Sequence, residues 1–89
     1  DPVFSETFST ALKVDREQFE QVVNEIGKDL LRLKGQIDFG NGPEFVEVVN
    51  GKLTIDHNSR VDFGNTSFVA IAWRLRQAEL RERIEATWS

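Results

Sequence analysis

Residues 44–57 read EFVEVVNGKLTIDH, two apolar-rich runs joined by Asn50-Gly51. Asn-Gly between such runs is the strongest short signal for a two-residue hairpin, because both central residues of a type I′ turn need a positive φ. The turn also fixes the register of the two strands. The expected cross-strand pairs are Val49–Lys52, Val48–Leu53, Val46–Ile55 and Glu44–His57. In this register, Phe45 and Val49 share one face of the hairpin.

Three further segments have the composition of strands. Residues 30–39, LLRLKGQIDF, form the clearest strand, with polar residues at the even positions from Arg32 to Asp38 and apolar residues at odd positions. The odd-numbered set is Leu31, Leu33, Ile37 and Phe39. Residues 67–75, SFVAIAWRL, form a nearly continuous apolar run, and 61–63 are a short strand or the start of this one.

The segment 4–12, FSETFSTAL, predicts a strand at an edge of the sheet. Phe4, Phe8 and Leu12 are its apolar residues at even positions, which point to the same side of a strand. Glu6 shares that parity, and a charged residue on the apolar side of a strand is typical of an edge.

Two segments predict helices. Asp15 is a good N-cap, Gln18 completes a capping-box pattern, and Gly27 can end the helix in a left-handed conformation, which gives a helix over 15–28. Its apolar stripe is Phe19, Val22, Val23, Ile26 and Leu30. The second helix covers 77–88 and carries Leu80, Ile84 and Trp88 on one face.

The order β-α-β-β-β-β-α predicts an α+β two-layer sandwich. We expect an antiparallel or mixed sheet of four or five strands with both helices on one face. No segment remains to cover the other face, where Phe45 and Val49 point. Exposed apolar groups on an open sheet face usually mark a contact surface, so these two residues are candidates for one.

Composition excludes several classes of function. The 89 residues are 39% hydrophobic and 29% charged, as in one soluble globular domain, and the net charge of −4 argues against a nucleic-acid partner. No apolar run reaches the ~18 residues of a membrane span, so we expect no membrane partner, and no signal peptide is in view. We expect a cytoplasmic protein. The absence of cysteine excludes disulfides and thiolate sites. The chain starts at Asp1-Pro2 and contains no methionine, which predicts that it is a fragment of a longer protein.

The triplet Asp-Phe-Gly occurs twice, in IDFGNG at 37–42 and in VDFGNT at 61–66. In a protein kinase this triplet holds magnesium beside a glycine-rich loop, a strand lysine and a catalytic loop, and the chain contains none of them. We interpret both copies as turns. Gly35 and Gly40 have the spacing of a phosphate-binding loop, but the lysine that the motif requires is missing.

His57 is the one histidine of the chain and its weak candidate for a metal ligand. The expected register sets Glu44 opposite His57, which favours a structural pair, while Asp56 points to the other face. Zinc requires four ligands, or three and a water, so we expect no metal site centred on His57. No serine has a histidine near it in the pattern, and a catalytic residue is not expected.

Arg32 and Lys34 form a basic pair on the outward face of the clearest strand. They either balance nearby carboxylates on a solvated face or contact a partner or another domain. Both alternatives fit the sequence.

The stretches GKDLLRLKGQI at 27–37 and FVEVVNGKLTI at 45–55 resemble the C-terminal domain of CobW-type (cobalamin synthesis protein-like) P-loop GTPases. The most specific part is the strand with Arg32, Lys34 and Gly35, and the resemblance extends over 4–88. Ala72-Trp73 departs from the family, whose last strand often ends in glycine and a polar residue.

The resemblance implies that 1–89 is a single CobW C-terminal-like domain, with an N-terminal GTPase domain before it. The parent protein would bind GTP and magnesium and would deliver zinc or cobalt, as a metallochaperone or in cobalamin synthesis. Many family members carry histidine-rich stretches in this part, whereas this chain has one histidine.

The implied function is therefore a non-catalytic C-terminal interaction or regulatory module, with no cofactor of its own. Its implied partners are its own GTPase domain and a metalloprotein client, contacted through Arg32, Lys34, Phe45 and Val49. Two alternatives stay open: an autonomous metal-binding domain centred on His57 with Glu44 or Asp56, and an unrelated small domain that binds proteins or small ligands.

Overall fold

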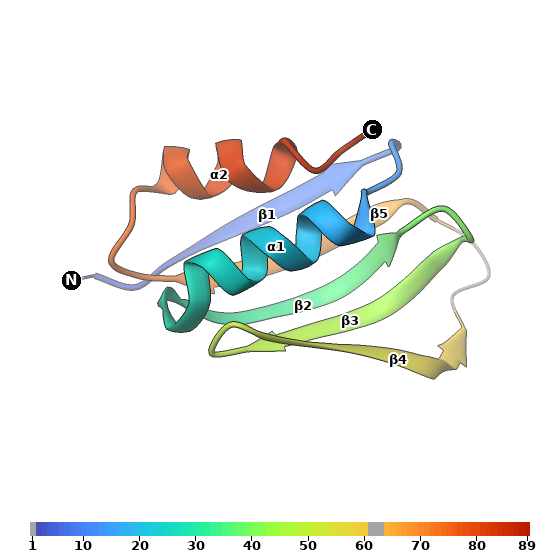
Figure 1. The fold of residues 1–89 in the computed structure, drawn as a ribbon, viewed down its shortest axis with the longest axis horizontal. Helices are drawn as coiled ribbons and strands as arrows, with labels where there is room; N and C mark the ends of the chain where they lie inside the picture. The colour runs from blue at the N-terminus through green and yellow to red at the C-terminus, as the bar shows by residue number, and fades with distance from the viewer. Residues whose placement is uncertain (1, 61–63) are drawn as a thin grey trace.

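The computed structural model describes residues 2–60 and 64–89, with the backbone alone at 57–60. It contains five strands, two α-helices and one 3₁₀ turn (Figure 1). In chain order these are β1 (Phe4–Thr10), α1 (Arg16–Ile26), the 3₁₀ turn (Gly27–Asp29), β2 (Leu30–Asp38), β3 (Pro43–Val49), β4 (Lys52–Arg60), β5 (Thr66–Ala72) and α2 (Gln77–Glu85). No helix of the described part is long and apolar enough to cross a membrane.

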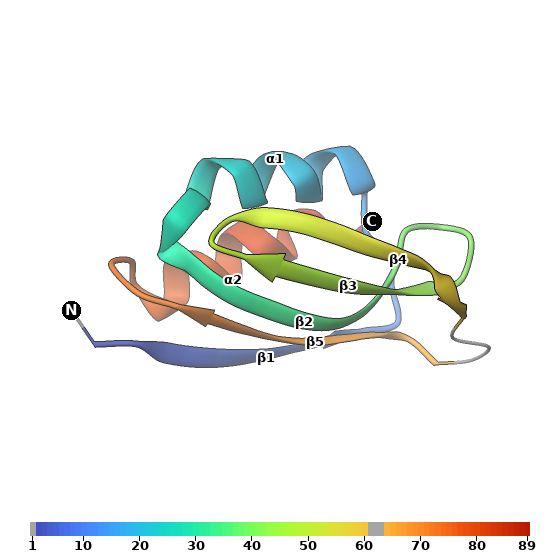
Figure 2. The ribbon, with the colours of Figure 1, turned by 90° about the horizontal axis from the view of Figure 1, so that it is seen from below.

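The strands form one sheet in the order β1-β5-β2-β3-β4, and every neighbouring pair is antiparallel. Figure 2 shows α1 and α2 on the same side of this sheet. The predicted α+β two-layer fold is therefore confirmed, and β1 is an edge strand as expected. The predicted short strand at 61–63 lies outside the described residues.

The start of α1 follows the capping prediction. The side chain of Asp15 accepts a hydrogen bond from the backbone N–H of Gln18 at 2.9 Å, and so pairs one of the N–H groups that the first helical turn leaves unsatisfied. Gly27 ends the helix as predicted, but with φ 61° and ψ −133°, which is a positive-φ conformation other than the left-handed helical one and which glycine adopts without a Cβ penalty.

The turn between β3 and β4 is of the expected kind, since Asn50 and Gly51 have φ values of 50° and 80°. Three of the four predicted pairs are confirmed: Val49–Lys52, Val48–Leu53 and Val46–Ile55. The fourth is wrong. The register shifts between Glu44 and Phe45, so that Glu44 lies opposite Arg60 instead of His57, with residues 57–59 inserted on the β4 side.

A second irregularity changes the predicted pattern of β2. The register of β2 with β5 shifts between Leu30 and Arg32, and Leu30 is fully buried where Leu31 is only half-buried. Leu12 also departs from its prediction, because β1 ends at Thr10 and Leu12 is 53% exposed.

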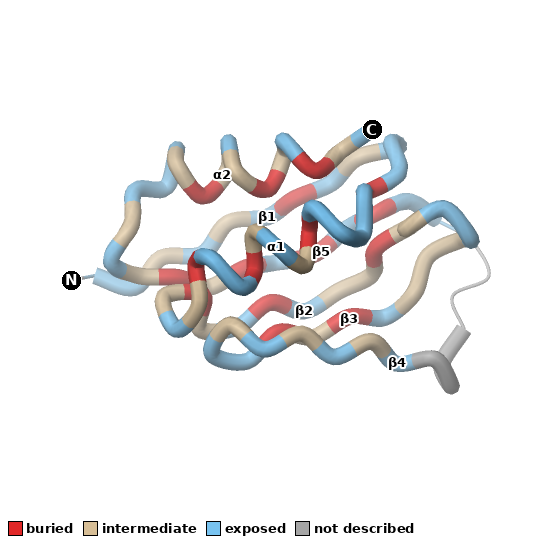
Figure 3. The backbone as a smooth tube through the Cα atoms, viewed as in Figure 1, coloured by how far each residue is buried: buried red, intermediate tan, exposed pale blue. Residues whose placement is uncertain are grey.

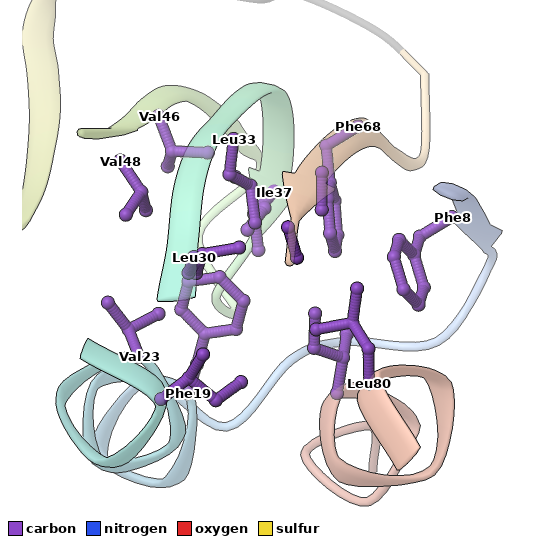
Figure 4. Close-up of a cluster of buried hydrophobic side chains, with 14 of the residues drawn as sticks. Phe8, Phe19, Val23, Leu30, Leu33, Ile37, Val46, Val48, Phe68 and Leu80 are labelled. Carbon is purple, nitrogen blue, oxygen red and sulfur yellow. The ribbon is translucent and has the colours of Figure 1, made fainter. Parts of the chain in front are cut away.

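The core lies between the helices and the inner face of the sheet (Figure 3). Figure 4 shows sheet residues such as Leu33 and Phe68 pointing toward Phe19 of α1 and Leu80 of α2. Phe8 and Phe68 stack with their ring centroids 5.0 Å apart, which joins β1 and β5 on the inner face. The helix layer thus covers one side of the sheet and leaves the other side to solvent.

Candidate docking surface

The side of the sheet away from the helices, here called the open face, consists of three rows of side chains that cross all five strands. The first row is Ser5, Ile71, Arg32, Val49 and Lys52. The second row is Thr7, Val69, Lys34, Glu47 and Thr54. The third row is Ser9, Ser67, Gln36, Phe45 and Asp56. Because side chains alternate along a strand, these positions face away from the buried ones.

Three large apolar side chains are exposed on the open face. The exposed fractions are 42% for Phe45, 41% for Val49 and 44% for Val69. The exposure of Phe45 and Val49 follows from the hairpin register and confirms where the sequence placed them. Val69 was missed because β5 lies in a nearly continuous apolar run, where alternation gives no signal. The pairing of Val69 with Thr7 of β1 and Lys34 of β2 is what places it on the open face.

Arg32 and Lys34 lie on the open face, as predicted, and the structure places them among these apolar groups. The Nη2 atom of Arg32 is 3.0 Å from Oε2 of Glu47, and both side chains are about half exposed. Lys34 stands between Val69 and Glu47 in the second row. An exposed ion pair of this kind contributes only about 0–1 kcal/mol, so a partner with its own charges can replace it at little cost.

The structure does not test the metal candidate His57. The side chain of His57 lies outside the described residues, and the backbone of Glu44 pairs with Arg60. Among the described side chains, no group of three or more histidine, cysteine, aspartate or glutamate residues could hold a metal ion.

The first Asp-Phe-Gly copy forms a turn, as interpreted from the sequence. Oδ1 of Asp38 accepts hydrogen bonds from the backbone N–H groups of Gly40, at 2.7 Å, and of Gly42, at 3.2 Å. The hydroxyl of Thr66 accepts from the backbone N–H of Asp38 at 2.9 Å. Asp38 therefore organises the end of β2. The triplet of the second copy, 61–63, lies outside the described residues.

Comparison with known proteins supplies the family. The family model described as the cobalamin synthesis protein cobW C-terminal domain matches residues 4–87. A search of curated protein sequences gave no match.

Two solved structures share the fold. One is the crystal structure of a Zn(II)-bound YjiA GTPase from E. coli, with a TM-score of 0.70 and 19% identity over 96% of this chain. The other is a Zn(II)-bound triple mutant of YjiA GTPase, with a TM-score of 0.71 and 19% identity over 98% of this chain. The match covers only 29% and 30% of those two chains. With nearly all of its residues matched by the family model, the chain belongs to the family of cobW C-terminal domains.

Proposed function

We propose that this domain is the non-catalytic C-terminal module of a larger CobW-type GTPase and that its open face docks on the GTPase domain of the same protein. The family match supports the place in a larger protein, as do two GTPase structures more than three times the length of the matched segment. A metalloprotein client is the second proposed partner, contacted through the same surface.

The observation that carries the proposal is the open face itself. Phe45, Val49 and Val69 are each more than two-fifths exposed on a rigid sheet, beside the basic pair Arg32 and Lys34. Exposed apolar and aromatic side chains with an arginine among them have the composition of protein interfaces, in which aromatic residues and arginine are enriched. A sheet also presents such a surface without loss of backbone entropy, which favours docking over binding by a flexible segment.

The chemistry of the whole protein is proposed to lie outside this chain. GTP and magnesium would bind to the GTPase domain, and zinc or cobalt would be the delivered metal, in cobalamin synthesis or as a metallochaperone in the cytoplasm. The role of this domain would be to couple that chemistry to a partner surface. Its described residues supply exposed apolar and basic groups for such a contact.

The test is the double variant Phe45→Ala/Val49→Ala in the full-length protein, studied by small-angle X-ray scattering. Loss of the two side chains should weaken docking by about 2 kcal/mol, or about thirty-fold, and increase the radius of gyration. Leu12→Ala is the matched control, because Leu12 is equally apolar and 53% exposed but lies in the loop after β1. Identical scattering from the double variant, the control and the parent would disprove docking through the open face.

A further inference from the structure

Lys34 lies at the centre of the open face without an ion-pair partner in the described part of the chain. It belongs to β2, the middle strand of the sheet, which Figure 2 shows between β5 and β3. Glu47 of β3 stands directly opposite Lys34, but its carboxylate is bound by Arg32, whose Nη2 atom is 3.0 Å from Oε2. The ammonium group of Lys34 is exposed and forms no hydrogen bond or ion pair with the described residues. In the free domain this charge is therefore solvated by water.

Apolar side chains surround Lys34 on both neighbouring strands. On β5, Val69 is its direct cross-strand partner and Ile71 is a diagonal neighbour. On β3, Phe45 and Val49 are its two diagonal neighbours. Diagonal neighbours on one face of a sheet lie about 7–8 Å apart, which is within reach of long side chains. A surface that covers these four apolar residues therefore also covers Lys34.

Covering an unpaired charge is costly. An ammonium group that leaves water is strongly destabilised unless an opposite charge replaces its hydration. Arg32 brings Glu47 into a contact as its counter-ion, whereas Lys34 brings none. The partner has to supply the missing negative charge.

From this arrangement we infer that the surface of the GTPase domain that meets the open face carries a carboxylate opposite Lys34, with apolar groups around it. The inference rests on the docking proposed for the open face, and it states the chemistry of the partner surface. A surface with apolar groups but no carboxylate at this point would leave the ammonium group covered and unpaired. Lys34 therefore selects the partner as well as binding it.

The distribution of charge over the domain fits an acidic partner surface. The open face bears three basic side chains, Arg32, Lys34 and Lys52, and two acidic ones, Glu47 and Asp56. The whole chain has a net charge of −4, so the open face is the basic side of an acidic domain. An acidic surface is attracted by this side and repelled by the remainder, which orients the domain as it docks.

A lysine can also extend its stem past the edge of a contact and keep its charge in water. In that arrangement no carboxylate is needed. The variant Lys34→Met distinguishes the two arrangements, because methionine keeps an unbranched apolar side chain and removes the charge. If a carboxylate lies opposite, the variant leaves that carboxylate covered and unpaired, and docking weakens. If none does, the variant removes only a desolvation cost, and docking is unchanged or tighter.

The experiment is the rate of thiol labelling at Ser67→Cys in the full-length protein, with and without Lys34→Met, read by mass spectrometry of the labelled peptide. Ser67 is exposed on the open face, so its cysteine reacts only while the domain is undocked. Lys34→Met should raise the rate at least about tenfold, as expected when one member of a covered charge pair is truncated. Loss of a nearby positive charge alone makes a thiol less reactive, so a faster rate reports undocking.

The matched control is Lys28→Met, which removes the same charge from an exposed lysine in the 3₁₀ turn after α1 and should leave the rate unchanged. Lys34→Arg retains the positive charge and should accelerate labelling much less than Lys34→Met.

Three results would overturn the inference, and they differ from one another. If Phe45→Ala/Val49→Ala raises the rate at position 67 and Lys34→Met does not, the open face docks but meets no carboxylate at Lys34. If neither variant raises the rate, docking through the open face fails, and the inference fails with it. If Lys28→Met raises the rate as much as Lys34→Met does, the effect comes from net charge and not from a contact at Lys34.

Discussion

Gly35 lies where two strands of the sheet approach too closely for any side chain. It pairs with Phe68 of β5, and a Cβ placed on Gly35 would lie 2.5 Å from the Cα of Phe68 and 2.6 Å from its Cβ, with the carbonyl oxygen of Ser67 also in contact. These atoms belong to the backbone of a central strand and to the base of a buried phenylalanine. They have no space into which to move.

Gly35→Ala is therefore expected to lower the free energy of unfolding by about 2 kcal/mol, the typical cost of overpacking a core. Urea denaturation measures this loss. The control is Gly27→Ala, where the added Cβ meets no atom within 4 Å, so that this variant carries only the cost of a positive φ, a feature that Gly35, with a φ of 157°, shares. Equal losses in the two variants would show that the close approach of β5 carries no cost.

The close contact of Gly35 with β5 could not be predicted from the sequence. The alternation of residues 30–39 placed it in a strand, and its spacing from Gly40 suggested a phosphate loop that lacked its lysine. The contact with Phe68 arises because β5 lies between β1 and β2, and only the sheet order gives that placement. The same order is needed to place Val69 on the open face, while the hairpin register sufficed for Phe45 and Val49.

Arg81 is a second residue whose role depends on long-range contacts. Its Nη2 atom is 2.7 Å from Oε2 of Glu6 and its Nη1 atom is 2.8 Å from Oε2 of Glu85, while its guanidinium lies 4.5 Å from the ring centroid of Phe8. The hydrogen bond with Glu6 is the largest cause that raises the pKa of Arg81 above its ordinary value, followed by the one with Glu85. The contribution of the Arg81 cation to the stability of the fold is lost only as pH rises through that raised pKa. This contribution is therefore constant near neutral pH.

Arg81→Gln should cost about 1–2 kcal/mol, because it removes charged hydrogen bonds that tie α2 to β1. Chemical denaturation at pH 7 measures the cost. Arg16→Gln provides the comparison, since Arg16 forms an exposed pair with Glu20 in the same helix, at 3.2 Å, and a distant contact with the ring of Phe39, 5.9 Å from its centroid, and should cost no more than about 1 kcal/mol. A smaller loss for Arg81→Gln than for Arg16→Gln would contradict the role assigned to Arg81.

At the scale of elements, the sequence around each helix and strand predicted where it lies, whereas contacts with neighbouring elements determine its register. The cap at Asp15 and the turn at Asn50-Gly51 were predictable because each depends on the backbone requirements of a few adjacent residues. The register shifts at Leu30 and at 57–59 could not be predicted from the sequence. A bulge forms to fit a neighbouring strand, and it has no signal in the residues around it. The pair predicted for Glu44 and His57 was wrong for that reason.

Asp15→Ala tests the predicted element boundary. Loss of the acceptor for the N–H of Gln18 should destabilise the protein by about 1 kcal/mol, whereas Asp15→Ser retains an acceptor and should cost only a small part of that. Thermal unfolding followed by far-ultraviolet circular dichroism gives both values. If alanine and serine had the same effect, the cap would not be what stabilises the start of α1.

At the scale of the whole molecule, one sheet face forms the core with two helices and the other face is left exposed. The helices bury Phe8, Leu33 and Phe68, while Phe45, Val49 and Val69 stay accessible on the same sheet. A chain that belongs to the cobW C-terminal family and matches less than a third of a GTPase structure is proposed to use this surface for docking. That docking is the central claim.

The most direct test is the rate of thiol labelling at single cysteines introduced into the full-length protein, read by mass spectrometry of the labelled peptide. This chain has no cysteine of its own, so Val69→Cys reports the open face and Glu82→Cys reports an exposed site on α2. Docking predicts that the cysteine at 69 reacts at least about tenfold more slowly in the full-length protein than in this domain alone, with no such difference at 82. Equal protection ratios at the two sites would contradict the claim that the open face is covered.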